Sequence, residues 1–203
     1  MSPEDVATFE RCIPVGGVAL FPADTVYGLA TDPDSREGVE RLYRLKGRRP
    51  ERPAAVMFFQ LELALVALPE LGERTRAALE RLLPGGVTLI VPNPERRYPL
   101  ACGPEPGRLG VRVPRLTGTL EPLAVASWPV LQSSANASGG PDARSVDRVD
   151  AAIRTGVDMI LDGGELPGTP STVVDLSEFE ERGRFRIARE GAVPSAEIES
   201  ALT

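Results

Sequence analysis

Short apolar runs alternate with amphipathic segments along most of the chain. A serine-proline pair at residues 2–3 is typical of a helix start, and the apolar residues that follow it up to Ile13 have helical spacing. Two glycines at 16–17 end this segment. The apolar run after them, closed by Pro22, has the length of a buried strand. The pattern therefore predicts a helix followed directly by a strand.

The same alternation continues to residue 188. Apolar runs bounded by turn residues predict about seven or eight strands, at 18–21, 54–59, 87–91, 109–113, 130–132, 159–161, 172–176 and 185–188. Helical spacing predicts about five or six helices, including 35–46, 61–68, 75–83, 146–153 and one near Leu120. The segment 177–183, with three glutamates, is expected to be a mobile surface loop.

This order of elements is typical of an α/β or α+β fold with one twisted, mixed sheet flanked by helices. We find no repeat, low-complexity tract or interdomain linker, so we expect a single domain over residues 1–203. The N-terminus has no signal-like stretch, and no apolar run approaches the ~20 residues that span a bilayer. We therefore expect a cytoplasmic protein that does not bind membranes.

The formal net charge is −6 and the sequence pI is about 4.9. Such a molecule repels a phosphate backbone, which disfavours a general nucleic-acid binder. A local group of arginines can still hold a small anion, because distant charges are screened over roughly 8–10 Å. The charge is therefore compatible with a nucleotide as ligand.

The chain contains no histidine, and its two cysteines, Cys12 and Cys102, are isolated in sequence. This excludes serine-histidine and cysteine-histidine triads and gives no sign of a zinc site or a disulfide framework. We expect both cysteines to be buried thiols. Catalysis must depend on Lys, Arg, carboxylates, hydroxyls, backbone amides or a metal that enters with the substrate.

Two polar segments stand out as candidate sites. Lys46, Arg48, Arg49 and Arg52 place four cations within seven residues, which fits a triphosphate but also an ordinary solvated loop. Residues 131–140 offer three serines, an asparagine and two glycines directly after a strand, which fits phosphate or ribose oxygens but also a flexible loop.

Other segments carry weaker signals. Residues 22–29 follow a strand and are compatible with a ligand site or a simple turn, and the glycine-rich stretches 162–164 and 168–175 are weak when taken alone. None of these segments matches the phosphate-binding loop or the dinucleotide fingerprint.

Taken together, eight short motifs resemble the YrdC-type threonylcarbamoyl-adenylate synthase family in its single-domain form. In chain order they are PADTVYGLATD, KGRRPERPAAV, LPGGVTLIV, LGVRVP, SSANASG, LDGG, PSTVVDL and RIAREGAV. They extend from about residue 10 to residue 193. The resemblance implies a twisted α/β sheet with a concave groove that binds ATP and L-threonine side by side.

The resemblance also implies a nucleotidyltransferase reaction. Bicarbonate joins the amine of L-threonine, and the carbamate attacks the α-phosphorus of ATP to give threonylcarbamoyl-AMP and pyrophosphate. The product serves the N6-threonylcarbamoyl modification of adenosine 37 in tRNA, with transferase proteins as functional partners. Mg²⁺ is expected to arrive with ATP, coordinated by phosphates and water, with no metal site of the protein itself.

Site residues follow from the motif positions. The resemblance implies that Lys46 and Arg48 are catalytic, and that ATP is bound by Lys46, Arg48, Arg52, Ser134, Asn136 and Arg189. It assigns threonine binding to Thr25, Arg112 and Ser171. Arg112 lies in an apolar strand and needs an anionic partner, which is either a substrate carboxylate or a structural salt bridge.

The chain departs from the family pattern at Ala23, Ala54, Met57 and Gly86. These residues leave a second interpretation open, in which a related ATP-dependent enzyme transfers a carbamoyl or adenylyl group to another small acceptor. A third interpretation is an RNA-binding protein that uses the same groove, although the negative net charge argues against it.

Overall fold

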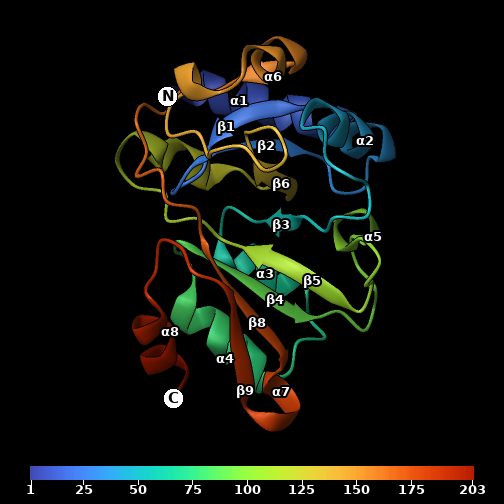
Figure 1. Ribbon diagram of the computed structural model, residues 1–203, viewed down its shortest axis with the longest axis vertical. Coiled ribbons are helices and arrows are strands. Elements are labelled where there is room, and N and C mark those ends of the chain that lie inside the picture. The colour runs from blue at the N-terminus through green and yellow to red at the C-terminus, as the bar shows by residue number, and fades with distance from the viewer.

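A computed structural model describes all residues from 1 to 203. Nine strands form one mixed sheet in the order β7-β1-β2-β6-β3-β5-β4-β8-β9, which runs along the long axis of the molecule (Figure 1). The strands are β1 (Ala19–Pro22), β2 (Tyr27–Thr31), β3 (Ala55–Met57), β4 (Val87–Pro92), β5 (Arg108–Arg112), β6 (Val130–Ser134), β7 (Met159–Ile160), β8 (Thr172–Glu178) and β9 (Arg184–Arg189).

Eight α-helices and three 3₁₀ helices surround the sheet. The α-helices are α1 (Pro3–Cys12), α2 (Arg36–Leu45), α3 (Leu61–Ala67), α4 (Glu73–Leu82), α5 (Pro99–Cys102), α6 (Ala151–Gly156), α7 (Phe179–Arg182) and α8 (Ser195–Leu202). The 3₁₀ helices are Ile13–Val15, Gly118–Val125 and Val146–Arg148. None of the helices has both the length and the apolar character that crossing a membrane requires.

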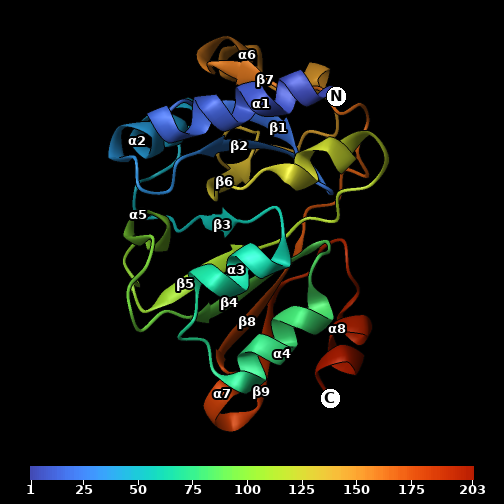
Figure 2. The same cartoon turned by 180° about the vertical axis from the view of Figure 1, so that it is seen from behind.

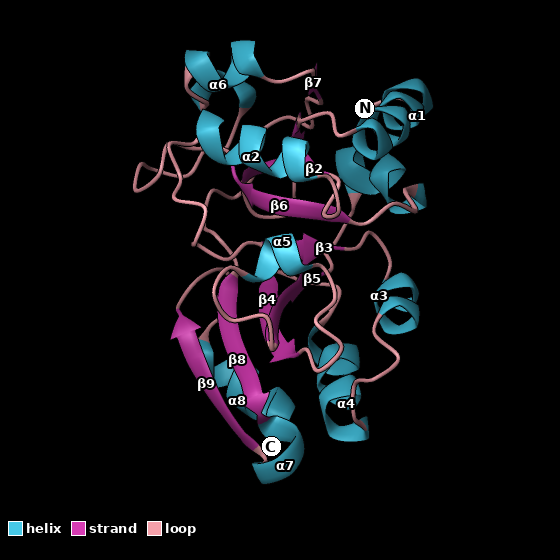
Figure 3. Cartoon of the chain, turned by 90° about the vertical axis from the view of Figure 1, so that its right-hand side faces the viewer, coloured by secondary structure: helices cyan, strands magenta, loops and turns pink.

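Helices cover both faces of the sheet near β1. Phe21 packs in a buried cluster with Phe9 of α1, whereas its neighbour Leu20 packs in the main core with Leu42 of α2. Since successive side chains of a strand point to opposite faces, α1 and α2 lie on opposite sides of the sheet, as Figure 3 shows.

The other half of the sheet is covered on one face only. Leu89, Val111 and Val174 share the main core with residues of α3, α4 and α8, which lie together on one face of the sheet, in front of β4 and β8 in Figure 2. The alternate residues of the same strands, including Thr88 and Gly110, face away from these helices and remain partly exposed. This open face is the floor of the groove described below.

Most predicted elements are confirmed. The N-terminal helix begins at the Ser2 cap, whose Oγ accepts from the Asp5 amide at 3.2 Å while Asp5 accepts from the Ser2 amide at 2.7 Å. Helix α2 begins after Ser35, whose Oγ accepts from the Gly38 amide at 3.1 Å. The predicted helix at 146–153 is divided into a short 3₁₀ helix and α6, which Asp150 caps.

The structure differs from the prediction at three points. The strand count is nine because β2, predicted only as part of a polar segment, is a fully buried partner of β1 and β6. The segment 177–183, expected to be a mobile loop, instead contains the end of β8 and helix α7. The ring of Phe179 in α7 is buried and packs against the core. Helices α5 and α8 were also not anticipated.

Candidate functional site

A groove of about 450 Å³ lies on the open face of the sheet. Its floor comes from β3, β4, β5 and β8, and residues of β6 and β9 form its sides. Five arginines and two carboxylates are among its lining residues: Arg48, Arg108, Arg112, Arg186, Arg189, Glu105 and Asp142. The lining therefore carries a net positive charge in a molecule whose net charge is negative.

Strand register explains which residues reach the floor. Arg112 pairs with Thr88, and Gly110 pairs with Ile90, so their side chains occupy the same face of β5 and β4. Gly110 also lies beside Ala55 of β3, where a Cβ on the glycine would approach Ala55 Cα to 3.3 Å. Small residues at this point keep the two strands close and the floor flat.

A bulge in β9 brings two arginines to the groove. Register shifts between β8 and β9 place Arg189 opposite Val173 and Arg186 opposite Asp175. Residues three apart on a regular strand point to opposite faces, but the bulge inserts an extra residue. Both arginines consequently line the groove.

The predicted Lys46 lies beneath the groove and is 2% exposed. Its Nζ donates to the carbonyl oxygens of Ser134 and Asn136, the latter at 2.7 Å, and to Asn136 Oδ1 at 3.1 Å. Asn136 Oδ1 also accepts from Ser134 Oγ at 2.6 Å. All three donors of the ammonium group are thus used by Ser134, the last residue of β6, and by Asn136 just after it.

Burial lowers the pKa of Lys46 to about 8, and the nearby charge of Arg48 adds to this effect. The three oxygen acceptors favour the charged form and act in the opposite direction. Lys46 therefore titrates much closer to neutral pH than an exposed lysine does.

The structure separates the two predicted arginines of the basic loop. Arg48 lines the groove, donates from Nη2 to the carbonyl of Pro53 at 2.5 Å and stacks over the ring of Tyr43 at 5.7 Å. Arg52 is exposed and is not among the lining residues, although its carbonyl accepts from the Tyr43 hydroxyl at 2.9 Å.

Arg112 is buried and already has an ionic partner within the chain. Its Nη2 donates to Asp24 Oδ1 and to Thr25 Oγ1, both at 2.5 Å. The structural salt bridge that sequence reasoning left open is therefore present. The guanidinium is not fully satisfied, however, because the buried Nε has no partner in the chain. Arg112 lines the groove, whereas Asp24 and Thr25 line a separate, more open hollow.

The predicted Ser171 lies at the same end of the groove. Its Oγ shares a hydrogen bond of 2.8 Å with Thr88 Oγ1, and its carbonyl accepts from Arg189 Nη2 at 2.7 Å. The structure thus gathers five predicted residues along one groove, namely Arg48, Arg112, Ser134, Ser171 and Arg189. It places Lys46 and Asn136 directly behind Ser134.

Two of the residues that depart from the family pattern lie away from the groove. Met57 and Ala23 are completely buried and belong to the cluster that packs under α1. Gly86 lines the separate hollow beside Asp24 and Thr25, where a Cβ would approach Thr25 Cγ2 to 3.3 Å. Among these positions, Ala54 alone lines the groove.

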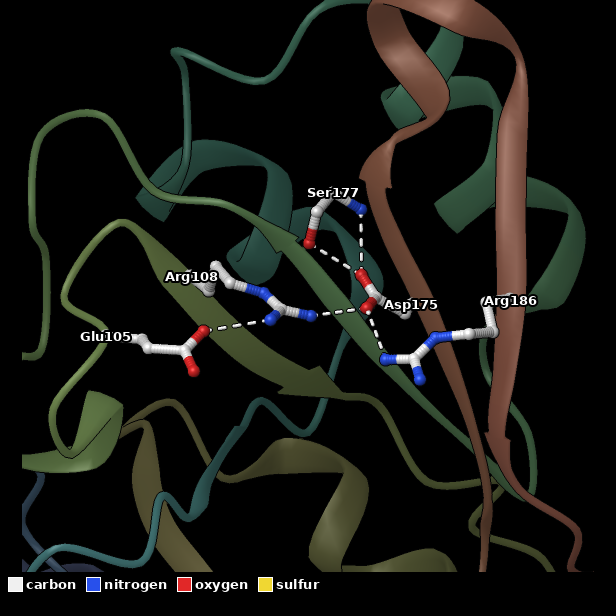
Figure 4. A network of polar contacts seen from close by, with 5 residues as sticks. All are labelled: Glu105, Arg108, Asp175, Ser177 and Arg186. Atoms are coloured by element: carbon white, nitrogen blue, oxygen red, sulfur yellow. Dashed lines mark hydrogen bonds and ion pairs between the residues drawn. The ribbon is translucent and has the colours of Figure 1, made fainter.

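Sequence reasoning did not identify a polar network at the other end of the groove (Figure 4). Arg108 of β5 and Arg186 of β9 both donate to Asp175 of β8, and Arg108 also donates to Glu105 at 2.8 Å. Arg108 is four residues before Arg112, and the two-residue period of a strand would have placed both on one face. No such signal was available for Arg186, because its position depends on the bulge.

The chain contains no group of three or more His, Cys, Asp or Glu side chains that could hold a metal ion. Two acidic residues at the groove, Glu105 and Asp175, instead form ion pairs with Arg108.

Known proteins resemble this chain over most of its length. The sequence profile of the Sua5/YciO/YrdC family, described as "Telomere recombination", matches residues 11–191. A threonylcarbamoyl-AMP synthase of Chromohalobacter salexigens is 35% identical over 81% of this chain and 89% of that protein. The protein of the same name from Pyrococcus abyssi is 30% identical over 92% of this chain but only 54% of its own length. The chain thus spans about half of that archaeal relative.

Solved structures share the fold. Sua5 of P. abyssi, crystallised as a complex with L-threonine, superposes with a TM-score of 0.85 at 28% identity, over 99% of this chain and 58% of that chain. Escherichia coli YciO superposes with a TM-score of 0.78 at 23% identity, over 97% of this chain and 94% of its own. The predicted fold, a twisted mixed sheet flanked by helices, is confirmed.

Proposed function

The chain belongs to the Sua5/YciO/YrdC family, and we propose that it is an L-threonylcarbamoyl-AMP synthase. It joins bicarbonate to the amine of L-threonine with loss of water and transfers the carbamate to the α-phosphorus of ATP, releasing pyrophosphate. The names of the relatives and the threonine complex of P. abyssi Sua5 support this assignment. Partner proteins then transfer the threonylcarbamoyl group to adenosine 37 of tRNA.

The observation that carries the proposal is that Arg112 and Arg189 line one end of the same groove, with Ser171 between them. Arg112 binds the carboxylate of threonine with donors that Asp24 and Thr25 leave free, since a guanidinium has five N–H groups. Ser171 and Thr25 offer hydroxyls to the same amino acid.

The phosphates of ATP lie against Arg48, Arg189 and Ser134. Charge moves onto the departing pyrophosphate as the carbamate oxygen attacks, and fixed guanidinium groups stabilise that charge without reorganising. Lys46 and Asn136 act from behind the groove by holding Ser134 in place. We assign Arg52 to the outer edge of the nucleotide site.

Mg²⁺ enters as part of the substrate, coordinated by phosphate oxygens and water. The chain's own contribution is the arrangement of cations along the groove.

The test is pyrophosphate release from ATP and bicarbonate in the presence of each of the twenty amino acids. We expect threonine alone to stimulate release. Arg112→Lys keeps a cation beside the buried Asp24 but removes the forked donor, so it should lower kcat/KM for threonine by about 100-fold. The exposed Arg148→Ala provides a control that alters charge elsewhere.

Release that is stimulated by another acceptor, and not by threonine, would retain the nucleotide site and replace the proposed substrate. A normal kcat/KM for Arg112→Lys would remove Arg112 from the threonine site and leave it as the partner of Asp24 only.

A further inference from the structure

The arginines that line the groove are held in different ways. Three of the five, Arg108, Arg112 and Arg186, form ion pairs with carboxylates of the chain, so their charge is partly balanced before a ligand arrives. Arg48 instead donates to the backbone carbonyl of Pro53 at 2.5 Å, and its buried Nε has no partner. Its orientation must therefore depend on a contact other than an ion pair.

That contact is the ring of Tyr43 in α2. Arg48 Cζ lies 5.7 Å from the ring centroid, within the ~6 Å over which a cation is attracted to an aromatic face. The ring is itself fixed, because Tyr43 is 4% exposed and packs in the main core. Since the ring is neutral, it holds Arg48 without cancelling the charge of the guanidinium.

Tyr43 also fixes the backbone of the basic loop at two points. Its carbonyl accepts from the Arg48 amide at 2.9 Å, and its hydroxyl donates to the carbonyl of Arg52 at 2.9 Å. Burial raises the pKa of Tyr43, so the hydroxyl keeps its proton and remains a donor at neutral pH. Both ends of the segment 48–52 are thus attached to one buried side chain and its own carbonyl.

Tyr43 lies outside the groove. It lines a hollow between α2 and α5, on which residues of both helices border, whereas Arg48 lines this hollow and the groove alike. Tyr43 can therefore influence a ligand in the groove only through Arg48 and the loop.

We propose that Tyr43 is a positioning residue, whose ring and hydroxyl hold Arg48 toward the groove and leave its charge available to the phosphates. The inference rests on the proposed function, in which Arg48 contacts the phosphates of ATP. A carboxylate in place of the ring would also hold Arg48, but its negative charge would oppose the binding of a phosphate nearby.

The first experiment measures ATP binding by calorimetry in the absence of threonine. Tyr43→Phe keeps the ring and removes the hydroxyl, so it should weaken ATP binding by about fivefold. Tyr43→Leu removes both and should weaken it by about 20-fold. Tyr98→Phe should leave the affinity unchanged, because Tyr98 packs against Phe58 and lines neither the groove nor the α2–α5 hollow.

Rescue by a free guanidinium separates positioning from a purely structural role. Arg48→Ala leaves the Tyr43 ring and the Pro53 carbonyl in place, so added methylguanidinium should recover about fivefold in ATP affinity. Rescue should persist when Tyr43→Phe is added and disappear when Tyr43→Leu is added. Arg49→Ala removes an exposed cation of the same loop that lines neither cavity, and it should not respond to methylguanidinium.

Several results would overturn the proposal. Equal rescue of the two double variants, or no rescue of Arg48→Ala itself, would show that the ring does not place the guanidinium. A lower melting temperature of Tyr43→Leu with unchanged ATP affinity would leave Tyr43 as a core residue only. If Tyr43→Leu does not fold, Tyr43→Phe decides, and an ATP affinity equal to that of the wild type then contradicts the inference.

The proposed function is tested separately by the unaltered enzyme. Absence of ATP binding by the wild type would remove the proposed function together with this inference. Each of the outcomes above, obtained with a wild type that binds ATP, removes the role of Tyr43 alone.

Discussion

Lys46 is the only lysine of the chain and is buried, and its Nζ joins α2 to the end of β6 and the segment after it through three oxygen acceptors. The pKa of Lys46, about 8 in the folded chain, lies below the ordinary value of 10.5. At a pH between these two pKa values, Lys46 has lost its proton in the folded state but still binds it in the unfolded state. The free energy of unfolding therefore gains a contribution that rises with pH across this window, by up to roughly 3 kcal/mol.

Other groups oppose this trend in the same pH range. The pKa of Tyr27 is raised to about 12 and the pKa values of Cys12 and Cys102 are also raised, in each case mainly by burial. Their folded states keep protons that the unfolded chain loses, so stability falls with pH on their account.

We expect the wild type to gain stability relative to Lys46→Met between pH 8 and 10, as measured by urea unfolding.

Lys46→Arg, which does not titrate in this range, provides a second comparison that preserves a cation. A constant difference between the wild type and both variants from pH 7 to pH 10 would show that Lys46 stays charged when folded.

At the residue scale, the sequence predicted which residues line the groove, but it did not predict which other residues they contact. The motifs containing Arg48, Arg112 and Ser134 marked residues that do line one groove. They did not show that Asp24 already pairs with Arg112, because that contact joins residues 88 positions apart. Nor did the spacing of Lys46 and Arg48 reveal that one lies behind the groove and the other in it.

Helix α4 is capped by a side chain from another helix. Its N-cap, Gly72, has no side chain, and Glu180 of α7 accepts from the Thr75 amide at 2.8 Å and from Thr75 Oγ1 at 2.9 Å. The carboxylate also lies near the positive end of the helix dipole. A Cβ on Gly72 would sit 2.2 Å from Glu180 Cδ, so the glycine permits this approach.

We expect Glu180→Ala to lower the free energy of unfolding by about 1 kcal/mol at pH 7, as the loss of a helix cap does. Glu180→Gln, which can still accept hydrogen bonds, should lose less. The exposed neighbour Glu181→Ala is the matched control, and chemical denaturation measures all three. Equal losses for Glu180→Ala and Glu181→Ala would exclude the cap.

At the element scale, periodicity located most strands and helices to within a few residues. It missed β2, whose five residues are all buried and so show no alternation. It also missed the bulge of β9, since the extra residue is defined by pairing with β8 and leaves no local mark. The polar segments at strand ends could therefore be predicted as parts of a site, but the position of Arg186 in the groove could not, because it depends on the bulge.

Charge is distributed unevenly over the whole molecule. The groove lining carries a net +3, which leaves −9 on the rest of a chain whose total is −6. Long-range attraction for a polyanion depends on the whole surface, whereas a small anion inside the groove responds to the nearest cations.

This distribution predicts a difference between two anionic ligands. At 150 mM NaCl we expect ATP to bind with a saturable isotherm, and a labelled duplex RNA to show no fluorescence anisotropy change up to about 100 µM protein. Lowering the salt to 50 mM should strengthen ATP binding modestly and still give no RNA binding, because dilution of salt also strengthens the repulsion from the acidic surface. Tight RNA binding that weakens steeply with salt would contradict this prediction and favour the RNA-binding interpretation of the groove. In that case Arg48→Ala should weaken RNA and ATP together, since both would use the same cations.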